Sequence, residues 1–459
     1  MGDRREHMGE VHSKQSNLRR HCDTLKKCPL AYDLRYNISY NSDNNRSYML
    51  SLRPHQERTI DTLANNEHGT VYIPTGGGKT ICMIEDLRAQ LVSAEYPTLT
   101  VVAAPRIMLA LQLANEFNEI LRNVSNYKVG SVHSGDTPFD SLTDELEIQR
   151  YVRSAHWFGS HVILFTTYHS LHKIANNEFF INTFYCDEAH NTTQRNFFPV
   201  VEEIVEQSTR KFFLTATPKM SSKHERGMNN TEVYGDNLIT VSADELLDVG
   251  AIIPPTVNVH TMETTRTKSE MADIDADTVI RVLDADNAER VLVAAPSARI
   301  ITQMIAFTDL FQELRDRDYH VMTITSKHGA HVDGKKVTRT QFFQTLSRFS
   351  DANEKFVLFH YSILSEGINV SGLTNVVLLR NLSTVEMAQT IGRVIRLDSH
   401  DRKAISNKTL RPGVYQNYRK PTGYISVPVH ANYGKNTAKR VQRTVDTIFT
   451  HGKPATAWI

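Results

Sequence analysis

The sequence predicts an α/β fold of two tandem domains, each organised around a parallel β-sheet, and three observations support this prediction. The chain has 459 residues, more than one hydrophobic core ordinarily holds, so we expect at least two domains. Apolar, β-prone segments alternate with amphipathic segments in both halves, a pattern typical of parallel sheets covered by helices. Residues 71–80, VYIPTGGGKT, combine an apolar strand, a glycine-rich turn and the start of a helix.

The turn within this segment has the composition of a loop that cradles phosphate groups. Its three glycines lack a Cβ, so backbone N–H groups of the turn can point inward. The helix that follows adds partial positive charge at its N-terminus. Lys79 is placed to reach the β- and γ-phosphates of a nucleotide, and Thr80 to bind Mg²⁺. The candidate nucleotide-binding residues here are Pro74, Thr75, Gly76, Gly77, Gly78, Lys79 and Thr80.

A second motif, FYCDEAH at 184–190, places two acidic residues after an apolar strand. An Asp-Glu pair after such a strand is common by chance, but a phosphate loop upstream gives it a specific use. We expect Asp187 to hold Mg²⁺, and Glu188 to orient and deprotonate the attacking water. His190 would couple this site to nucleic-acid contacts.

Two further segments of the first half fit the same site. Gln56 lies in SLRPHQER, at the start of a predicted helix upstream of the loop. Its amide has one acceptor and two donors, so it can pair with both the N6 and N7 edges of adenine. KFFLTATP, at 211–218, is a predicted strand that ends in the small hydroxyl residues Thr215 and Thr217.

With PTGGGKT, DEAH and TAT in this order, the chain resembles a superfamily 2 helicase of the DEAH type. It is similar in style to restriction-enzyme-type helicases (type III restriction subunit-like) and to related phage and viral DNA helicases. The strict phosphate-loop pattern has Gly where this chain has Ile73, and xxPTGxGKT is the form that superfamily 2 uses. The resemblance covers residues 51–400 and implies two RecA-like domains that flank a cleft, with ATP and Mg²⁺ as cofactors of the site.

The resemblance also assigns two motifs in the second half. SEGINV resembles the loop that touches the nucleotide ribose and the nucleic-acid backbone, through Gly367 and Asn369. The family usually has Asp where this chain has Asn369, so a charge is missing there. QTIGRVIR matches QxxGRxxR, and on a helix Gln389, Arg393 and Arg396 would share one face. Two arginines on that face are typical of an arginine-finger surface aimed at the γ-phosphate across a cleft.

These motifs divide the chain into five predicted segments, with a Pro254-Pro255 pair stiffening the connector between the two domains. The segments are an N-terminal extension (1–50), a first RecA-like domain that binds ATP (51–245), a linker (246–258), a second RecA-like domain (259–400) and a basic C-terminal segment (401–459).

The C-terminal segment concentrates positive charge. It has eleven basic and two acidic residues, a net charge of +9, whereas the whole chain has a net charge of +1. Tyr415, Tyr418, Tyr424 and Tyr433 are interleaved with the basic residues. Basic groups with aromatic platforms suit a nucleic-acid track, but a solvated cap packed on the second domain explains the pattern equally well.

The composition excludes several classes of protein. Hydrophobic content of 40% and charged content of 22% are those of a soluble globular protein. We expect no membrane helix, because no apolar run approaches the ~20 residues required, and no secretory signal. Four cysteines favour a reducing, intracellular setting, the cytoplasm or the host cell of a virus, over a disulfide framework. Cys22 and Cys28 have no matching second pair, so we expect no zinc site.

The sequence therefore predicts an ATP-dependent helicase or translocase that acts on nucleic acid, with DNA favoured over RNA by analogy to the restriction-type and phage relatives. The main alternative is a motor subunit of a restriction or remodelling complex that moves on duplex DNA without separating its strands. An RNA helicase is also open. A nucleotide-dependent scaffold is disfavoured because Glu188 and both arginines are present. The sequence identifies no protein partner.

Overall fold

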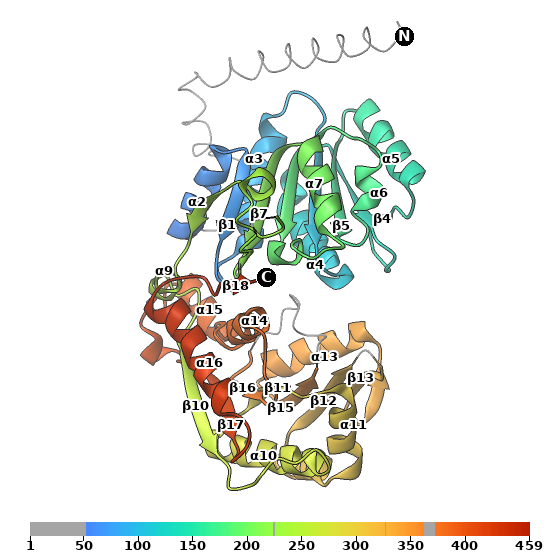
Figure 1. The fold of residues 1–459 in the computed structure, drawn as a ribbon. Helices are drawn as coiled ribbons and strands as arrows, with labels where there is room; N and C mark the ends of the chain where they lie inside the picture. The colour runs from blue at the N-terminus through green and yellow to red at the C-terminus, as the bar shows by residue number, and fades with distance from the viewer. Residues whose placement is uncertain (1–51, 224, 326, 362–371) are drawn as a thin grey trace, which may run out of the picture. The chain divides into compact units, whose positions relative to one another are not determined.

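The computed structural model describes residues 52–223, 225–325, 327–361 and 372–459. The predicted N-terminal extension and the predicted loop residues Gly367 and Asn369 lie outside the described residues. Within the described residues, the first half of the sequence forms one eight-stranded sheet and the second half forms another (Figure 1).

The first sheet is parallel throughout. Its strands are β1 (His68–Tyr72), β2 (Leu99–Ala104), β3 (Tyr127–Val132), β4 (Asp140–Ser141), β5 (His161–Thr167), β6 (Ile181–Asp187), β7 (Ser208–Thr215) and β9 (Asp236–Thr240). They lie in the order β4-β3-β5-β2-β6-β7-β1-β9. Because β7 lies between β6 and β1, the loops that follow these three strands open side by side at the carboxyl edge of the sheet, where ligands bind in open α/β folds.

Helices alternate with these strands along the chain, as the sequence predicts. They are α2 (Pro54–Ala64), α3 (Lys79–Ser93), α4 (Ile107–Ile120), α5 (Glu145–Trp157), α6 (His172–Ala175), α7 (Phe198–Gln207), α8 (Thr231–Tyr234) and α9 (Ala243–Asp248). α4 packs on β2, β3 and β5, and α7 packs on β6 and β7. The strands are therefore covered by helices, and every residue of β2 and β5 is buried, which accounts for their continuous apolar character.

The second sheet is parallel except at one edge. Its strands are β10 (Pro255–Thr261), β11 (Arg290–Ala294), β12 (His320–Thr325), β13 (Gly329–Val332), β14 (Lys335–Val337), β15 (Phe356–His360), β16 (Asn375–Leu378) and β17 (Gly423–Val429), in the order β10-β17-β16-β11-β15-β12-β13-β14. Only the β12-β13 and β13-β14 pairs are antiparallel among its described strands. The helices are α10 (Met271–Asp286), α11 (Ala298–Phe307), α12 (Leu310–Asp316), α13 (Arg339–Ala352), α14 (Thr384–Val394), α15 (Ser399–Ser406) and α16 (Lys435–Val445).

The basic C-terminal segment is part of this architecture. β17 lies between β10 and β16 in the second sheet and pairs with both in parallel. The chain then forms α16 and ends in β18 (Ala457–Trp458), which pairs with β8 (Lys219–Met220) of the first half. A segment that supplies an internal strand is integral to the sheet, because β10 has no other partner among the described strands.

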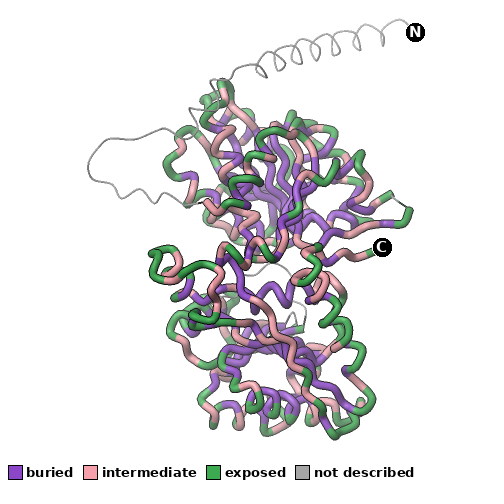
Figure 2. Tube along the Cα trace, turned by 90° about the vertical axis from the view of Figure 1, so that its left-hand side faces the viewer, coloured by how far each residue is buried: buried purple, intermediate pink, exposed green. Residues whose placement is uncertain are grey.

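Two parallel-dominated α/β sheets confirm the predicted fold class. The strands of both sheets form buried bands in the tube drawing, with exposed residues on the surrounding helices (Figure 2). Cys82 and Cys186 are free and buried in the first half, and burial raises the pKa of the Cys82 thiol to about 12. Both cysteines therefore act as small apolar core residues.

Candidate nucleotide-binding site

The predicted phosphate loop joins β1 to α3 at the carboxyl edge of the first sheet. Gly76 and Gly78 have φ angles of 92° and 87°, left-handed conformations that glycine adopts without steric cost. A Cβ at Gly77 would lie 2.4 Å from Ile73 Cγ2, so the middle position also requires glycine. α3 begins at Lys79, and the N–H groups of its first turn have no intrahelical acceptors. They are available to an anion.

Two residues of α2 hold this loop. The His55 ring donates from Nε2 to the carbonyl oxygen of Gly77 at 2.8 Å, and Gln56 Nε2 donates to the same oxygen at 3.4 Å. Gln56 Oε1 accepts a hydrogen bond from the backbone of Arg53 at 3.0 Å. The Gln56 amide is therefore engaged with the loop and with the start of its own helix, and its contact with adenine stays a prediction.

The acidic pair lies in a sharp turn at the end of β6. Asp187 is the last residue of the strand, and Glu188 has φ 50° and ψ 47°. This left-handed conformation costs a residue with a Cβ about 1–2 kcal/mol, and such strain is concentrated at functional sites. Glu188 Oε1 lies 3.9 Å from Lys79 Nζ. The structure thus brings together the predicted general base and the predicted phosphate lysine.

The electrostatics of this pair fit a divalent cation. Burial, followed by repulsion from Glu188, raises the pKa of Asp187 to about 7, and the nearby charge of Lys79 opposes the shift. Asp187 Oδ1 is buried and accepts no hydrogen bond from any described residue. An unpartnered carboxylate oxygen beside a phosphate loop is the type of ligand that Mg²⁺ takes together with nucleotide phosphates. Asp187 therefore fits the metal-binding role predicted for it, with Thr80 in the first turn of α3.

His190 connects the acidic motif to the end of β7. Its Nδ1 lies 2.9 Å from Thr215 Oγ1 and 3.3 Å from Thr217 Oγ1. Burial lowers the pKa of His190 to about 4, so the ring is neutral near pH 7. The structure therefore gives a physical link between the DEAH and TAT motifs within the first half. A link from His190 to nucleic acid stays a prediction.

The second half contributes α14, which carries most of the QTIGRVIR motif. Ser383 caps its N-terminus, since its side chain accepts from the backbone of Glu386 and Glu386 reaches back to the backbone of Ser383. Gln389 and Arg393 are buried on this helix. The helix ends at Val394, so the prediction that Arg396 shares a helical face with them is wrong.

Arg396 instead lies in an extended segment after α14. It forms an isolated antiparallel bridge with Ile252, and the backbone N–H of Ile253 donates to the carbonyl oxygen of Ile395 at 2.9 Å. This external pairing with the connector between the two sheets draws the chain out of the helical path. Such long-range pairing leaves no signal in the local 3.6-residue period.

The charge of Glu188 in the acidic motif affects the pKa values of Arg393 and Arg396. Leu52–Ile459 forms one compact unit. Burial, followed by repulsion from Arg396, lowers the pKa of Arg393 to about 9, and Glu188 opposes this shift. For Arg396, burial and then Arg402 lower the pKa to about 10, and both Glu116 and Glu188 oppose. Two buried guanidinium groups that repel each other favour the binding of an anion.

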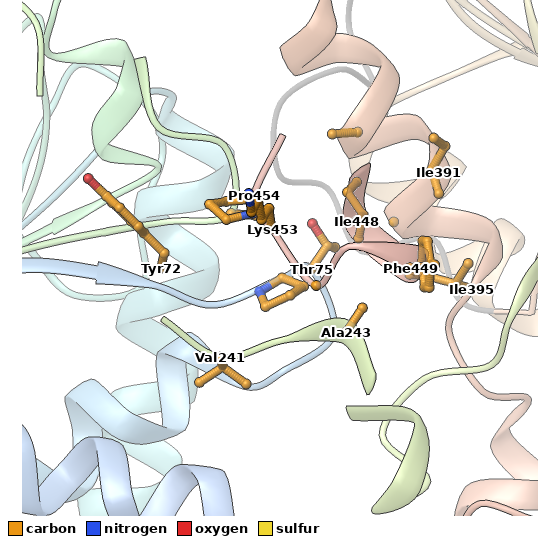
Figure 3. A pocket seen from close by; sticks show the side chains of 15 residues that line it. Tyr72, Thr75, Val241, Ala243, Ile391, Ile395, Ile448, Phe449, Lys453 and Pro454 are labelled. Carbon is orange, nitrogen blue, oxygen red and sulfur yellow. The ribbon is translucent and has the colours of Figure 1, made fainter. Parts of the chain in front are cut away.

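The glycine of QTIGRVIR has a specific contact with the phosphate loop. A Cβ at Gly392 would lie 2.5 Å from Thr75 Cβ, so only glycine lets α14 approach this closely. A small cavity adjoins the contact and is lined by Pro74 and Thr75, by Ile391 of α14 and Ile395 just after it, and by residues of the C-terminal tail that include Phe449 (Figure 3). Its lining lacks Lys79 and the acidic residues of the site, so it is an apolar packing seam beside the nucleotide-binding groups.

Two family models match the chain. A DEAD/DEAH box helicase model matches residues 53–225, and a helicase conserved C-terminal domain model matches residues 275–398. Together the two models cover well over half of the sequence. They include the phosphate loop and acidic motif of the first half and the QTIGRVIR motif of the second half. The chain belongs to the DEAD/DEAH-box helicases. The resemblance that the motifs predict is confirmed.

Solved structures with the same fold include restriction-modification enzymes in complex with DNA or a DNA mimic and proteins bound to RNA. The Type ISP restriction-modification enzyme LlaBIII bound to DNA matches with a TM-score of 0.64 and 16% identity, over 89% of this helicase and 31% of that chain. LlaGI in complex with a DNA substrate mimic matches with a TM-score of 0.59 and 16% identity, over 89% of this helicase and 30% of that chain.

A variant of the S. cerevisiae helicase Dbp5 bound to RNA and ADP BeF3 matches with a TM-score of 0.52 and 15% identity, over 88% of each chain. At these identities the matches show the fold. The helicase spans about a third of the length of the two restriction enzymes. No curated protein matches its sequence, and no described helix is long and apolar enough to cross a membrane.

The structure also corrects part of the aromatic prediction for the C-terminal segment of the helicase. Tyr418 is 5% exposed, and its hydroxyl accepts from the backbone of Gly413 and donates to the carbonyl of Arg411. The ring is part of the core and is not available to stack on a base. Tyr433 packs under the guanidinium of Arg266, which lies 4.4 Å from the ring centroid.

Sequence reasoning missed two residues that the structure places next to the predicted site. His55 precedes Gln56 and contacts the phosphate loop; its position within the same short motif is a signal that could have indicated it. Lys420 is 4% exposed, although a nucleic-acid track, one of the two interpretations of the basic segment, predicts a solvated side chain there. Its Nζ donates to the carbonyls of Val394 and Arg396, and no local pattern reveals that pairing.

Proposed function

We propose that this helicase is a DNA-directed motor in which ATP bound to the first half is hydrolysed only when Arg393 and Arg396 of the second half join the site. The observation that carries the proposal is electrostatic: the Glu188 carboxylate lies near enough to both guanidinium groups to oppose the lowering of their pKa values by burial. Hydrolysis then depends on the distance between the arginines of the second half and the acidic motif of the first half. This dependence couples ATP hydrolysis to domain movement.

Each group has a separate task in this proposal. Lys79 and the backbone N–H groups of the loop bind the β- and γ-phosphates. Asp187 and Thr80 would hold Mg²⁺, which neutralises phosphate charge when bound. Glu188 orients the attacking water and accepts its proton. Arg393 and Arg396 stabilise the charge that develops on the transferring phosphoryl group.

DNA is the proposed substrate because the DNA-bound restriction motors have higher TM-scores, 0.64 and 0.59, than RNA-bound Dbp5 at 0.52. This support is at the level of the fold, since the identities are 16% and 15%. Strand separation is the first candidate activity. Translocation on duplex DNA is the second, because the helicase matches about a third of each restriction enzyme and corresponds to one component of a larger machine.

α16 is the proposed electrostatic contact with the nucleic-acid backbone. Lys435, Lys439, Arg440 and Arg443 are all exposed on this helix, and Lys435, Lys439 and Arg443 recur every four residues along one side. The opposite side is buried through Val441 and its neighbours. No ion pair within the described residues involves these four cations. They are therefore available to phosphate groups.

The substrate is tested by measuring ATP hydrolysis with single-stranded DNA, duplex DNA and single-stranded RNA side by side, using the Lys79→Ala variant as the baseline. We expect the strongest stimulation from DNA. Stimulation by RNA alone would contradict the DNA assignment and leave the hydrolytic site intact. A strand-displacement assay beside a triplex-displacement assay then separates the two candidates. Displacement of the third strand without duplex unwinding would identify a translocase.

A further inference from the structure

The chain segment between the two arginines is held from outside its own helix. The last carbonyl groups of a helix have no intrahelical donors and need partners elsewhere. Here three consecutive carbonyls are bonded: those of Val394 and Arg396 accept from Lys420 Nζ at 2.6 and 2.9 Å, and that of Ile395 accepts from Ile253 N at 2.9 Å. Two different parts of the chain therefore fix this single turn.

Lys420 is itself held in place by a buried carboxylate. Asp401 is 1% exposed, and its two oxygens accept from the backbone N–H groups of Arg419 at 3.0 Å and Lys420 at 3.1 Å. Gly423, three residues further along, packs on the same turn, and a Cβ there would lie 2.3 Å from the carbonyl oxygen of Val394. The segment 419–423 thus fits closely against the end of α14.

An ammonium group at this position suits the negative end of the helix dipole, but its burial has a large cost unless it is fully hydrogen-bonded. Burial, and then the charges of Arg290 and Arg396, lower the pKa of Lys420 to about 7, while Asp398 and Asp401 oppose the shift. A neutral amine still has two N–H groups for the two carbonyls. The contacts therefore persist on both sides of pH 7.

We propose that Lys420 is a positioning residue for the finger arginines: it fixes the last turn of α14 and thereby the directions in which Arg393 and Arg396 present their guanidinium groups. This inference rests on the proposed function, because it assigns a role through those two arginines. Lys420 bonds the backbone of Arg396 directly and that of Val394, the neighbour of Arg393. Misplacement of a catalytic group by about 1 Å can lower a rate by about 10²-fold.

The test replaces Lys420 with methionine, which keeps the length of the side chain and removes its donors. We expect kcat for nucleic-acid-stimulated ATP hydrolysis to fall about ten- to hundredfold, with the Kd for ATP within about threefold of wild type. Lys211→Met is a matched control, because Lys211 Nζ also donates to carbonyls at the end of a helix, those of Val205 and Ser208. That helix, α7, ends at the amino edge of the first sheet, whereas the nucleotide-binding residues lie at the carboxyl edge. The kcat of Lys211→Met should therefore be unchanged.

A double-mutant cycle separates positioning from general structural damage. In a background of Arg393→Ala and Arg396→Ala, Lys420→Met should lower kcat by less than about twofold, because no fingers remain to be displaced. An equal loss in both backgrounds, or wild-type kcat for Lys420→Met alone, would overturn the inference. Lys420→Gln, which keeps an amide donor, replaces the methionine variant in the same cycle if the latter does not fold.

The finger role of the two arginines and the positioning role of Lys420 are tested separately. If Arg393→Ala and Arg396→Ala leave kcat unchanged, the finger assignment of the proposed function is wrong. If these variants lower kcat and Lys420→Met does not, the finger assignment stands and the positioning role of Lys420 is wrong.

Discussion

The two halves of the helicase place their charged groups by different means. In the first half, Lys79 and Asp187 lie where parallel strands end, within a few residues of β1 and β6. In the second half, Arg393 is near the last turn of α14 and Arg396 is beyond it. That turn is held by Ile253, from the connector, and by Lys420, which is 24 positions further along the chain than Arg396.

This difference bears on how the enzyme can be regulated and altered. A strand end is fixed by a whole sheet, so the first half offers a rigid nucleotide platform. The turn after α14 depends on one lysine and one connector bond, and the connector joins the two sheets. The arginines are therefore the part of the site most able to respond to domain movement.

The largest effect is expected from Lys79→Ala in the first half. The substitution removes the phosphate counter-charge at the start of α3, so ATP binding and hydrolysis should both be abolished. The fold should persist, because Lys79 is not a core residue. Nucleotide binding by calorimetry and turnover by phosphate release check this, with the exposed Lys128→Ala as control. Wild-type hydrolysis by Lys79→Ala would reject the site.

Glu188→Gln should separate binding from chemistry within the same half. The amide keeps the shape of the side chain and cannot accept the proton of the attacking water, so single-turnover hydrolysis should fall by about 10²–10⁴-fold. ATP affinity should be retained, since the phosphate loop is untouched. A single-turnover rate equal to that of wild type would remove Glu188 from its role as general base.

A smaller effect is expected at α16, remote from the chemistry. Charge reversal to Glu at Lys435, Lys439 and Arg443 removes three phosphate contacts, and the salt slope of DNA binding should fall by about 0.7–0.9 for each. The basal ATPase without nucleic acid should stay near wild type. Reversal of Arg122, Arg150 and Arg153, which are exposed in the first half, is the charge-matched control. An unchanged salt slope of DNA binding would show that α16 does not contact phosphate groups and serves only as a structural cap.

The smallest effect concerns stability and pH at Lys420. Its pKa is about 7 in the folded protein and 10.5 as a free side chain, so the unfolded chain binds more protons between these values. Stability should therefore rise as pH increases from about 7 to about 9, by up to about 1.4 kcal/mol per pH unit. Thermal midpoints of wild type and Lys420→Met over this range should change differently. If the thermal midpoints of the two proteins changed with pH in the same way, Lys420 would not be a buried group that titrates in this range.

Local sequence patterns predicted the two parallel-dominated sheets, and they also proposed the first-half candidate site. The apolar runs before the phosphate loop and before the acidic pair predicted their strands because parallel strands are buried on both faces. Asp187 and Glu188 were proposed because an acidic pair at the end of an apolar strand follows a phosphate loop in the same chain. The same reasoning could not anticipate the left-handed backbone of Glu188, which depends on tertiary packing around the turn.

Long-range contacts were beyond the reach of that reasoning. The charge of Lys420 and the ring of Tyr418 predicted exposure, yet both are buried because β17 inserts into the second sheet and carries the preceding loop inward. The sequence predicted that the helix continues through Arg396, but α14 ends at Val394. The hydrogen bond from Ile253 to the carbonyl of Ile395 replaces a helical one. In each case the missing information was a partner distant in sequence.

We propose that Arg393 and Arg396 stabilise the transition state of ATP hydrolysis at the site in the first half. The most direct measurement compares the affinity of wild type and Arg393→Ala for ADP and for ADP with tetrafluoroaluminate, a mimic of the transferring phosphoryl group. Transition-state mimics bind far more tightly than ground-state ligands when the site is complementary to the transition state. The account predicts that Arg393→Ala retains wild-type affinity for ADP and loses at least about tenfold of the gain from tetrafluoroaluminate. An unchanged gain, or a loss found entirely in ADP affinity, would contradict it.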